Sequence, residues 1–209
     1  MYTGKFITIE GCEGCGKTTQ IEMLKEYCAV KGIDALFTRE PGGTAIAEKI
    51  RNVILDTANM GMESLTELFL FSASRVEHIV NVVLPALKAG KTVFCDRFTD
   101  STLAYQVYGR ELLEEAVKKI NAISTNSLII DCTIFLDVEP SEGFSRIATR
   151  GEADRMERMG IDFHKKVYNG FLDIAKKEPK RIAKISGKQS KEKVHNDIIA
   201  TLKQRGIMQ

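Results

Sequence analysis

One short segment, from Gly11 to Thr18, constrains this chain more than any other. It reads G-C-E-G-C-G-K-T and fits the pattern G-x-x-x-x-G-K-[ST]. The apolar run from Phe6 to Ile9 before it is typical of a buried strand, and apolar residues at helical spacing follow it as far as Gly32. Glycines let the backbone wrap an anion so that N–H groups face phosphate oxygens. Between a strand and a helix, the segment predicts a phosphate-binding loop rather than a plain glycine turn.

The loop also predicts how a nucleoside triphosphate is held. Lys17 is expected to reach the outer phosphates, and the Thr18 hydroxyl to hold Mg2+. The residues predicted to bind the triphosphate are the loop and its neighbour: Gly11, Cys12, Glu13, Gly14, Cys15, Gly16, Lys17, Thr18 and Thr19. The loop alone does not say what receives the phosphate.

Composition narrows the class of protein. A chain of 209 residues with 44% hydrophobic and 28% charged residues fits one soluble domain, residues 1–209. The net charge of +2 is too small for a long nucleic-acid track or an anionic membrane surface. We find no charged leader with an apolar region, and no apolar run near the ~20 residues of a membrane span. We therefore expect a cytoplasmic protein without nucleic-acid or membrane partners.

The five cysteines are odd in number and scattered, which argues against a disulfide framework. Cys12 and Cys15 form a C-x-x-C, but no second such pair or nearby histidine pair completes a zinc site. A redox pair is a weaker alternative to two small side chains at the free positions of the loop. A thiol near a helix N-terminus can still be reactive towards oxidants.

Five short β-rich runs alternate with helical stretches and predict a parallel sheet with helices on both faces. The expected strands are Phe6 to Ile9, Asp34 to Thr38, Thr92 to Cys95, Thr133 to Asp137 and Arg181 to Ile185. The expected helices are Lys17 to Lys31, Thr44 to Asp56, Ser64 to Lys88, Glu111 to Ile123, Ser141 to Thr149, Asp162 to Lys177 and Ser190 to Lys203. Ser64 and Glu67 are spaced as a capping box. Ligands of such sheets bind beyond the carboxyl ends of the strands.

The third expected strand ends in Asp96-Arg97. Asp96 is placed to join the Mg2+ shell, directly or through water. Many ATP-hydrolysing motors have Glu after this Asp to activate water, whereas Arg97 suits a second phosphate. GTPases are disfavoured because the chain has no N-K-x-D sequence. The alternative is a surface ion pair after a strand.

Two further arginines can join Arg97 at a phosphate monoester. Arg39 ends the second strand before Glu40-Pro41-Gly42-Gly43-Thr44, and Arg51 lies in the following helix. A phosphate dianion favours several forked donors. Alone, each of these arginines is also compatible with a solvated surface position.

The expected third helix carries Phe71 and Arg75 on one face. An aromatic plane and a guanidinium can stack a base and bond its edge, but the residues alone favour core packing for Phe71. Phe69, Val76 and Ile79 are the stronger core candidates. Between Arg146 and Arg158 the chain is dense in charge, which fits a solvated helix end and a mobile lid equally well.

The chain resembles the thymidylate kinase family almost from end to end. The segments that carry the resemblance, in family order and spacing, are G-C-E-G-C-G-K-T-T-Q, T-R-E-P-G-G-T, F-S-A-S-R, D-R-F-T-D-S-T-L-A-Y-Q and R-G-E-A-D-R-M-E. The resemblance implies a P-loop NTPase fold with a short lid at about residues 142–160. It also implies a homodimer, ATP with Mg2+ as the phosphoryl donor, and dTMP as the acceptor.

By this resemblance Phe71 stacks on thymine, Arg75 and Gln106 read its polar edge, and Thr102 lies nearby. Tyr105 crowds the sugar 2′ position, and Glu13 lies by the 3′-hydroxyl. The dTMP phosphate is addressed by Arg39, Arg51 and Arg97.

The phosphate loop lacks the arginine that some family members keep there, so the resemblance assigns a catalytic arginine to Arg150 on the lid. The other expected catalytic residues are Lys17, Arg39 and Arg97. Two positions depart from the family pattern. Phe98 replaces a usual tyrosine, which puts a hydrogen bond in doubt, and Val107-Tyr108 replaces glycines, which puts the loop over the sugar in doubt.

Two other kinds of function stay open at this stage. A kinase for another monophosphate or for a deoxynucleoside shares the loop and lid, although a nucleoside kinase needs a carboxylate base and offers no clear candidate beyond Glu40. A nucleotide-binding module without catalysis is the second alternative.

Overall fold

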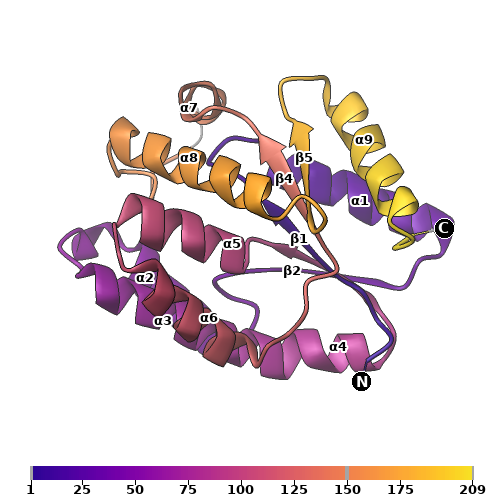
Figure 1. Cartoon of the computed structure of the whole chain (residues 1–209), viewed down its shortest axis with the longest axis horizontal. Helices are drawn as coiled ribbons and strands as arrows, with labels where there is room; N and C mark the ends of the chain where they lie inside the picture. The colour runs from indigo at the N-terminus through magenta and orange to yellow at the C-terminus, as the bar shows by residue number, and fades with distance from the viewer. Residues whose placement is uncertain (1, 149–150, 209) are drawn as a thin grey trace.

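Five parallel strands form the centre of the molecule, in the order β2-β3-β1-β4-β5. The computed structural model describes residues 2–148 and 151–208 (Figure 1). The sheet confirms the predicted α/β class, and each predicted strand is present within one residue at either end. The strands are β1 (Phe6–Glu10), β2 (Ala35–Arg39), β3 (Thr92–Asp96), β4 (Cys132–Asp137) and β5 (Ile182–Ser186).

The helices cover both faces of this sheet (Figure 1). Ile7 and Ile9 of β1 pack with the first and last helices, whereas Phe6 on the opposite face packs with the long third helix. Successive side chains of a strand point to opposite faces, so one buried strand serves both cores. The helices are α1 (Lys17–Lys31), α2 (Ala45–Leu55), α3 (Ser64–His78), α4 (Leu84–Lys88), α5 (Thr99–Thr102), α6 (Glu114–Thr125), α7 (Pro140–Ile147), α8 (Ile161–Lys177) and α9 (Lys191–Gln204).

The predicted third helix is continuous but not uniform. Between α3 and α4 lies a π-helical stretch, η2 (Ile79–Val83), in which the Leu84 N–H bonds to the carbonyl of Ile79. Pro85 follows at the start of α4 and lacks the N–H that a regular turn needs. By length and hydropathy alone, Ser64–Lys88 meets the criteria for a membrane span, contrary to our reading of the sequence. Core helices of soluble proteins meet the same criteria.

Two expectations for this helix are wrong. Glu63, not Ser64, is the N-cap and makes no side-chain cap, while Glu67 is fully buried and bonds elsewhere. Phe69 and Val76 are not core residues. Phe69 is 54% exposed and Val76 is 43% exposed, because they face away from the sheet. Ile79 is buried as expected.

The elements predicted from the sequence do not include the helical segment that follows β3, α5 with η3 (Leu103–Gly109). The α5 helix continues into the π-helical η3, and a short 3-10 turn, η1 (Thr57–Asn59), follows α2. Threonine, serine and tyrosine at the start of the α5–η3 segment have modest helix propensity. Tertiary packing on α8 stabilises it.

Candidate active site

The phosphate loop links β1 to α1 and has the backbone that its glycines permit. Gly14 and Gly16 have φ values of 68° and 99°, and Gly16 is the N-cap of α1 without a side-chain cap. The first N–H groups of α1 therefore remain available to an anion. Beside them, Thr18 and Thr19 are exposed and line a cavity of about 820 Å3.

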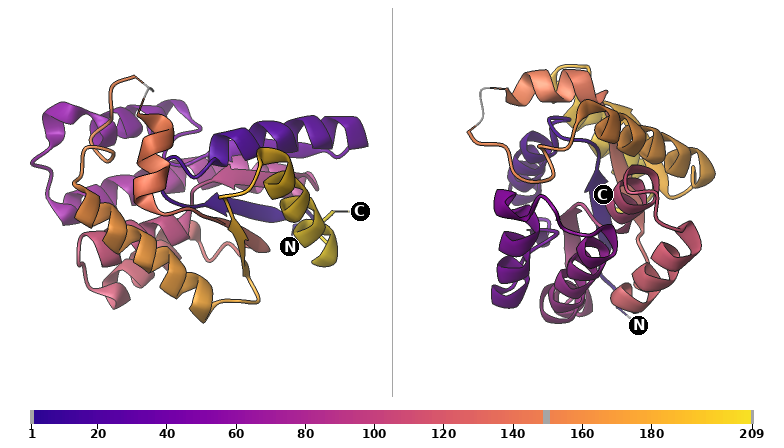
Figure 2. Two further views of the ribbon diagram at one scale, coloured as in Figure 1. Left: turned by 90° about the horizontal axis from the view of Figure 1, so that it is seen from above. Right: turned by 90° about the vertical axis from the view of Figure 1, so that its left-hand side faces the viewer.

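The loop is in close contact with α7. A Cβ on Gly14 would lie 2.0 Å from the carbonyl oxygen of Gly143, and a Cβ on Gly143 would lie 2.1 Å from the carbonyl oxygen of Glu13. Figure 2 shows α7 beside the start of α1. The start of the segment predicted as a lid is therefore seated on the backbone of the loop.

Lys17 and the loop cysteines are all buried. Lys17 Nζ donates to the carbonyls of Gly11 and Cys12 at 3.2 and 3.1 Å. Cys12 and Cys15 belong to different core clusters, so their side chains pack in different regions. Burial raises the pKa of the Cys12 thiol, which lowers the fraction of reactive thiolate. The packing thus favours small structural side chains over a redox pair.

A second, smaller cavity of about 150 Å3 lies against the first. Its wall contains Phe71, Arg75, Thr102, Tyr105 and Gln106. All five are residues that the resemblance assigns to the nucleoside of dTMP. The fold brings them together from α3, α5 and η3.

The two cavities share a wall rich in charge. Six residues line both cavities: Glu13, Arg39, Arg51, Asp96, Arg97 and Asp154. Arg39 Nη1 and Arg51 Nη1 both donate to the carbonyl of Pro41, at 2.7 and 3.0 Å. Burial and the neighbouring Arg39 hold the pKa of Arg51 below its usual range, and an anion between these arginines would relieve the like-charge contact.

Arg97 is the member of the shared wall with the most unusual backbone. Its backbone has φ 65°, an uncommon conformation for a residue with a side chain, and Nη1 donates to the carbonyl of Gly11 at 2.9 Å. Nη2 pairs with the Glu13 carboxylate, which also accepts the Tyr105 hydroxyl at 2.8 Å. Burial opposes ionisation of Glu13, but the charges of Arg97 and Lys17 outweigh it and lower its pKa. The carboxylate thus fixes both the arginine and the tyrosine.

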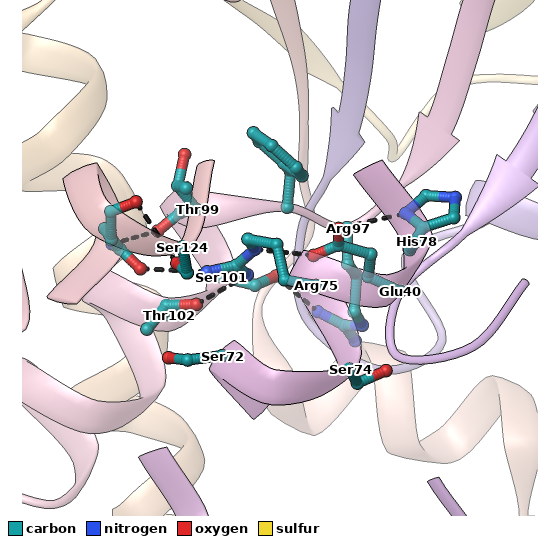
Figure 3. A network of polar contacts seen from close by, with 12 residues as sticks. Glu40, Ser72, Ser74, Arg75, His78, Arg97, Thr99, Ser101, Thr102 and Ser124 are labelled. Atoms are coloured by element: carbon teal, nitrogen blue, oxygen red, sulfur yellow. Dashed lines mark hydrogen bonds and ion pairs between the residues drawn. The ribbon is translucent and has the colours of Figure 1, made fainter. Parts of the chain in front are cut away.

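Arg75 is held by a buried polar network (Figure 3). Nε donates to Glu40 at 2.7 Å, Nη2 to Thr102 at 2.8 Å, and Nη1 to Asn121 at 2.8 Å. The other Glu40 oxygen contacts His78 Nδ1 at 3.0 Å. These contacts fix the guanidinium at the wall of the smaller cavity. Phe98 packs against it with its ring centroid 5.0 Å away, so the hydroxyl of the usual tyrosine is not needed for this contact.

A second network surrounds Glu67, on the same helix. Its carboxylate accepts from Arg110 Nη2 at 2.8 Å and from Gln106 Nε2 at 3.0 Å. Arg155 completes an ion pair at 2.7 Å and is fully buried, so it is not a solvated residue of a charged helix end. Arg155 Nε also donates to the carbonyl of Ile54 in α2. The end of the charged segment is therefore anchored beside the smaller cavity.

The family model described as thymidylate kinase matches residues 9–198 of this chain. This chain belongs to the thymidylate kinase family.

Individual family members align over nearly the whole chain. A thymidylate kinase of Lactobacillus helveticus is 48% identical over 97% of each chain. One of a Thermoanaerobacter species is 46% identical over 96% of this chain and 98% of its own. The crystal structure of the Ehrlichia chaffeensis thymidylate kinase superposes with a TM-score of 0.79 at 36% identity, over 95% of this chain and 98% of that chain.

The family resemblance did not single out several residues that the structure brings to the site. Asp154 lines both cavities and accepts the N–H groups of Met156 and Glu157 through Oδ1. Glu40 and Glu67 accept hydrogen bonds from two residues that line the smaller cavity, Arg75 and Gln106. One feature of the sequence could have indicated the buried networks: Glu67, Arg75 and His78 are polar residues on a helix face that was expected to be apolar. Arg150 lies outside the described residues, so its assignment stays a prediction.

Two residues suit a magnesium ion. Thr18 and Asp96 both line the larger cavity. Asp96 Oδ1 is buried without a hydrogen-bond partner in the described part of the chain. An unpartnered buried carboxylate oxygen is what a cation or its water shell would satisfy.

Glu10 is linked to Arg97 through Ser101, whose hydroxyl oxygen accepts from Arg97 Nη1 at 3.2 Å. Its carboxylate accepts the Phe98 N–H at 2.7 Å and the Ser101 hydroxyl at 2.5 Å, and it is fully buried. Burial and the neighbouring Asp100 raise the pKa of Glu10 to about 7.

This shift predicts a pH-dependent stability. Between its ordinary value of 4.5 and about 7, the folded chain holds a proton at Glu10 that the unfolded chain has lost. The contribution of Glu10 to stability is therefore full below pH 4.5 and falls as the pH rises to about 7. We expect Glu10→Gln to gain ~2 kcal/mol relative to wild type between about pH 5 and about pH 8, measured by urea unfolding. A difference that does not change with pH would contradict the shifted pKa.

Proposed function

We propose that this chain transfers the γ-phosphoryl group of ATP to the phosphate of dTMP, giving dTDP and ADP. The observation that carries the proposal is the shared wall. A cavity lined by the phosphate loop and a cavity lined by Phe71, Arg75 and Gln106 meet at Arg39, Arg51 and Arg97. A donor and an acceptor phosphate can meet only where both cavities open, and three arginines lie there.

The acceptor needs no general base, because a phosphate monoester is already anionic at neutral pH. Catalysis then depends on position and on charge neutralisation. Lys17 and the N–H groups at the start of α1 hold the ATP phosphates, while Arg39 and Arg51 hold the dTMP phosphate. Arg97 lies between the two and neutralises the charge of the transferring group.

Thr18 and Asp96 hold the Mg2+ that accompanies ATP. When bound, the ion neutralises charge on the phosphate oxygens. Glu13 keeps Arg97 and Tyr105 in place, so the Tyr105 ring limits the space at the sugar 2′ position and favours deoxyribose. Arg150, which lies outside the described residues, is proposed as a further catalytic arginine on the lid.

A coupled ADP assay tests this proposal against its alternatives. The substrates are dTMP, dUMP, dCMP, AMP and thymidine, each with ATP and Mg2+. We expect ADP release with dTMP at least tenfold faster, as kcat/KM, than with dCMP or AMP. ADP release with thymidine but not with dTMP would indicate a nucleoside kinase. If none of these acceptors gave ADP release, the chain would be a non-catalytic binding module.

We further propose that the chain forms a homodimer through the outer face of α3 and η2, in a reducing, cytoplasmic compartment. Leu65, Phe69, Val76 and Val80 are between 43% and 58% exposed. Their spacing places them on one side of the continuous helix. A contiguous apolar face of this kind is typical of a protein interface. In the described part of the chain the cysteines are free and buried, as expected in a reducing compartment.

The dimer predicts a specific effect of one charge. Val76→Glu should place an unpaired carboxylate in the interface and give particles of the single-chain mass, 23.3 kDa, by light scattering. The matched control is Val30→Glu, at an isolated position that is 83% exposed, which should leave the mass of two chains. A wild-type protein that is already monomeric, or a Val76→Glu dimer, would contradict this interface.

A further inference from the structure

The side-chain amide of Gln106 has a donor atom, Nε2, and an acceptor atom, Oε1, and the fold gives a protein partner to the donor. Gln106 is 1% exposed and lines the smaller cavity. Its Nε2 donates to Glu67 Oε1 at 3.0 Å. In the described part of the chain, the side-chain hydrogen bond of Gln106 is made by Nε2, and none ends on Oε1. The amide therefore has its donor end engaged with protein and its acceptor end available to a ligand.

Glu67 is what fixes this orientation. Its carboxylate is fully buried between Arg110 and Arg155, whose Nη2 atoms lie 2.8 and 2.7 Å from Oε2. Burial opposes ionisation, but the hydrogen bonds and charges of the two arginines outweigh it and lower the pKa of Glu67. An ionised carboxylate can only accept hydrogen bonds. If the Gln106 amide turned over, its oxygen would face another oxygen in a buried site, so the amide cannot turn over without loss of this bond.

We propose that Glu67 is a positioning residue for base specificity: it holds the Gln106 amide with its oxygen towards the base and so selects a pyrimidine with a hydrogen on N3. The inference rests on the proposed function, which places the base in the smaller cavity. Thymine and uracil carry N3–H, a donor that matches Oε1. Cytosine has an unprotonated N3, an acceptor, which would face Oε1 without a hydrogen between them.

The consequence is that rejection of cytosine depends on a residue that does not touch the base. In Glu67→Gln, the new amide can either accept or donate, so the Gln106 amide gains a second orientation with its NH2 towards the base. That orientation pairs with N3 of cytosine. A site built around a hydrogen bond rejects an unmatched partner strongly, and it loses that rejection when its polar group can reorient.

The experiment measures kcat/KM for dTMP and for dCMP on the same enzyme preparation, so that any inactive fraction cancels in the ratio. We expect Glu67→Gln to raise the dCMP to dTMP ratio by about tenfold or more. Glu67→Asp, which still only accepts, should keep the wild-type ratio even if both rates fall. Arg110→Lys is the matched control: it alters a contact with the same carboxylate but keeps a cation beside it, so the carboxylate stays ionised and the ratio should stay unchanged.

Two outcomes would overturn the proposal. Equal losses for both substrates in Glu67→Gln, with the ratio unchanged, would mean that Glu67 only supports the fold. If Glu67→Gln does not fold, Gln106→Met takes its place: an unchanged ratio there would show that Gln106 does not read N3. Failure of the proposed function is distinguishable, because the wild-type enzyme would then not phosphorylate dTMP at all.

Discussion

Replacement of Arg97 by alanine should lower the turnover of dTMP phosphorylation by about 1,000-fold, by analogy with other arginines that stabilise a transferring phosphoryl group. Arg97 lines both cavities, and its Nη atoms are fixed by the Gly11 carbonyl and the Glu13 carboxylate. The guanidinium is thus in place before substrates bind, which makes its contribution to the transition state large. Steady-state ADP release at saturating ATP and dTMP measures the effect.

Arg97→Lys is the informative control. It keeps a positive charge but loses the fork that bonds Gly11 and Glu13 at once. We expect an intermediate loss of turnover, because charge neutralisation is partly retained while position is not. If Arg97→Ala retained turnover within about tenfold of wild type, Arg97 would have no role in charge neutralisation. Circular dichroism and thermal unfolding would show whether the variant remains folded without the Glu13 partner.

Replacement of Phe71 by alanine should raise the KM for dTMP by about 10- to 100-fold and leave the KM for ATP nearly unchanged. Stacking of a base on an aromatic ring contributes roughly 1–3 kcal/mol, which corresponds to this range. Phe71 lines the smaller cavity and not the larger one, so the effect should be confined to the acceptor. Initial rates with each substrate varied in turn separate the two constants.

A neighbour on the same helix provides the control for Phe71. Phe69 is 54% exposed and lines neither cavity, so Phe69→Ala should leave both KM values near wild type. Equal rises in the KM for dTMP and for ATP in Phe71→Ala would instead indicate a general loss of packing. The pair thus separates a base contact from a structural contact on one helix.

Phe71 illustrates how far local sequence patterns reach. Helical spacing placed Phe69, Phe71 and Val76 on a helix correctly, but it ranked Phe69 and Val76 as core and Phe71 as core by default. The structure exposes Phe69 and Val76 and places Phe71 in a cavity wall. Apolar periodicity reports that a face is covered, but it does not report whether protein core, ligand or a second chain covers it.

Glu67 illustrates the opposite error. Its position three residues after Ser64 suggested a capping box, which is a local interaction. In the structure it pairs with Arg110 and Arg155, which are 43 and 88 residues away (110 − 67 and 155 − 67). Such partners come from different elements, and no local spacing predicts them.

The sequence by itself determined the phosphate loop and the order of strands and helices along the chain, and through its family segments it predicted which residues surround the two phosphates. These features are local: glycine conformations, apolar alternation and short motifs depend on neighbouring residues. Only the tertiary structure decided that Arg39, Arg51 and Arg97 line one wall between two cavities, and that Glu13, Glu40 and Glu67 hold side chains that line these cavities. Those contacts join strand ends and helices far apart in the chain, and the parallel sheet brings them together because its strands end at one edge.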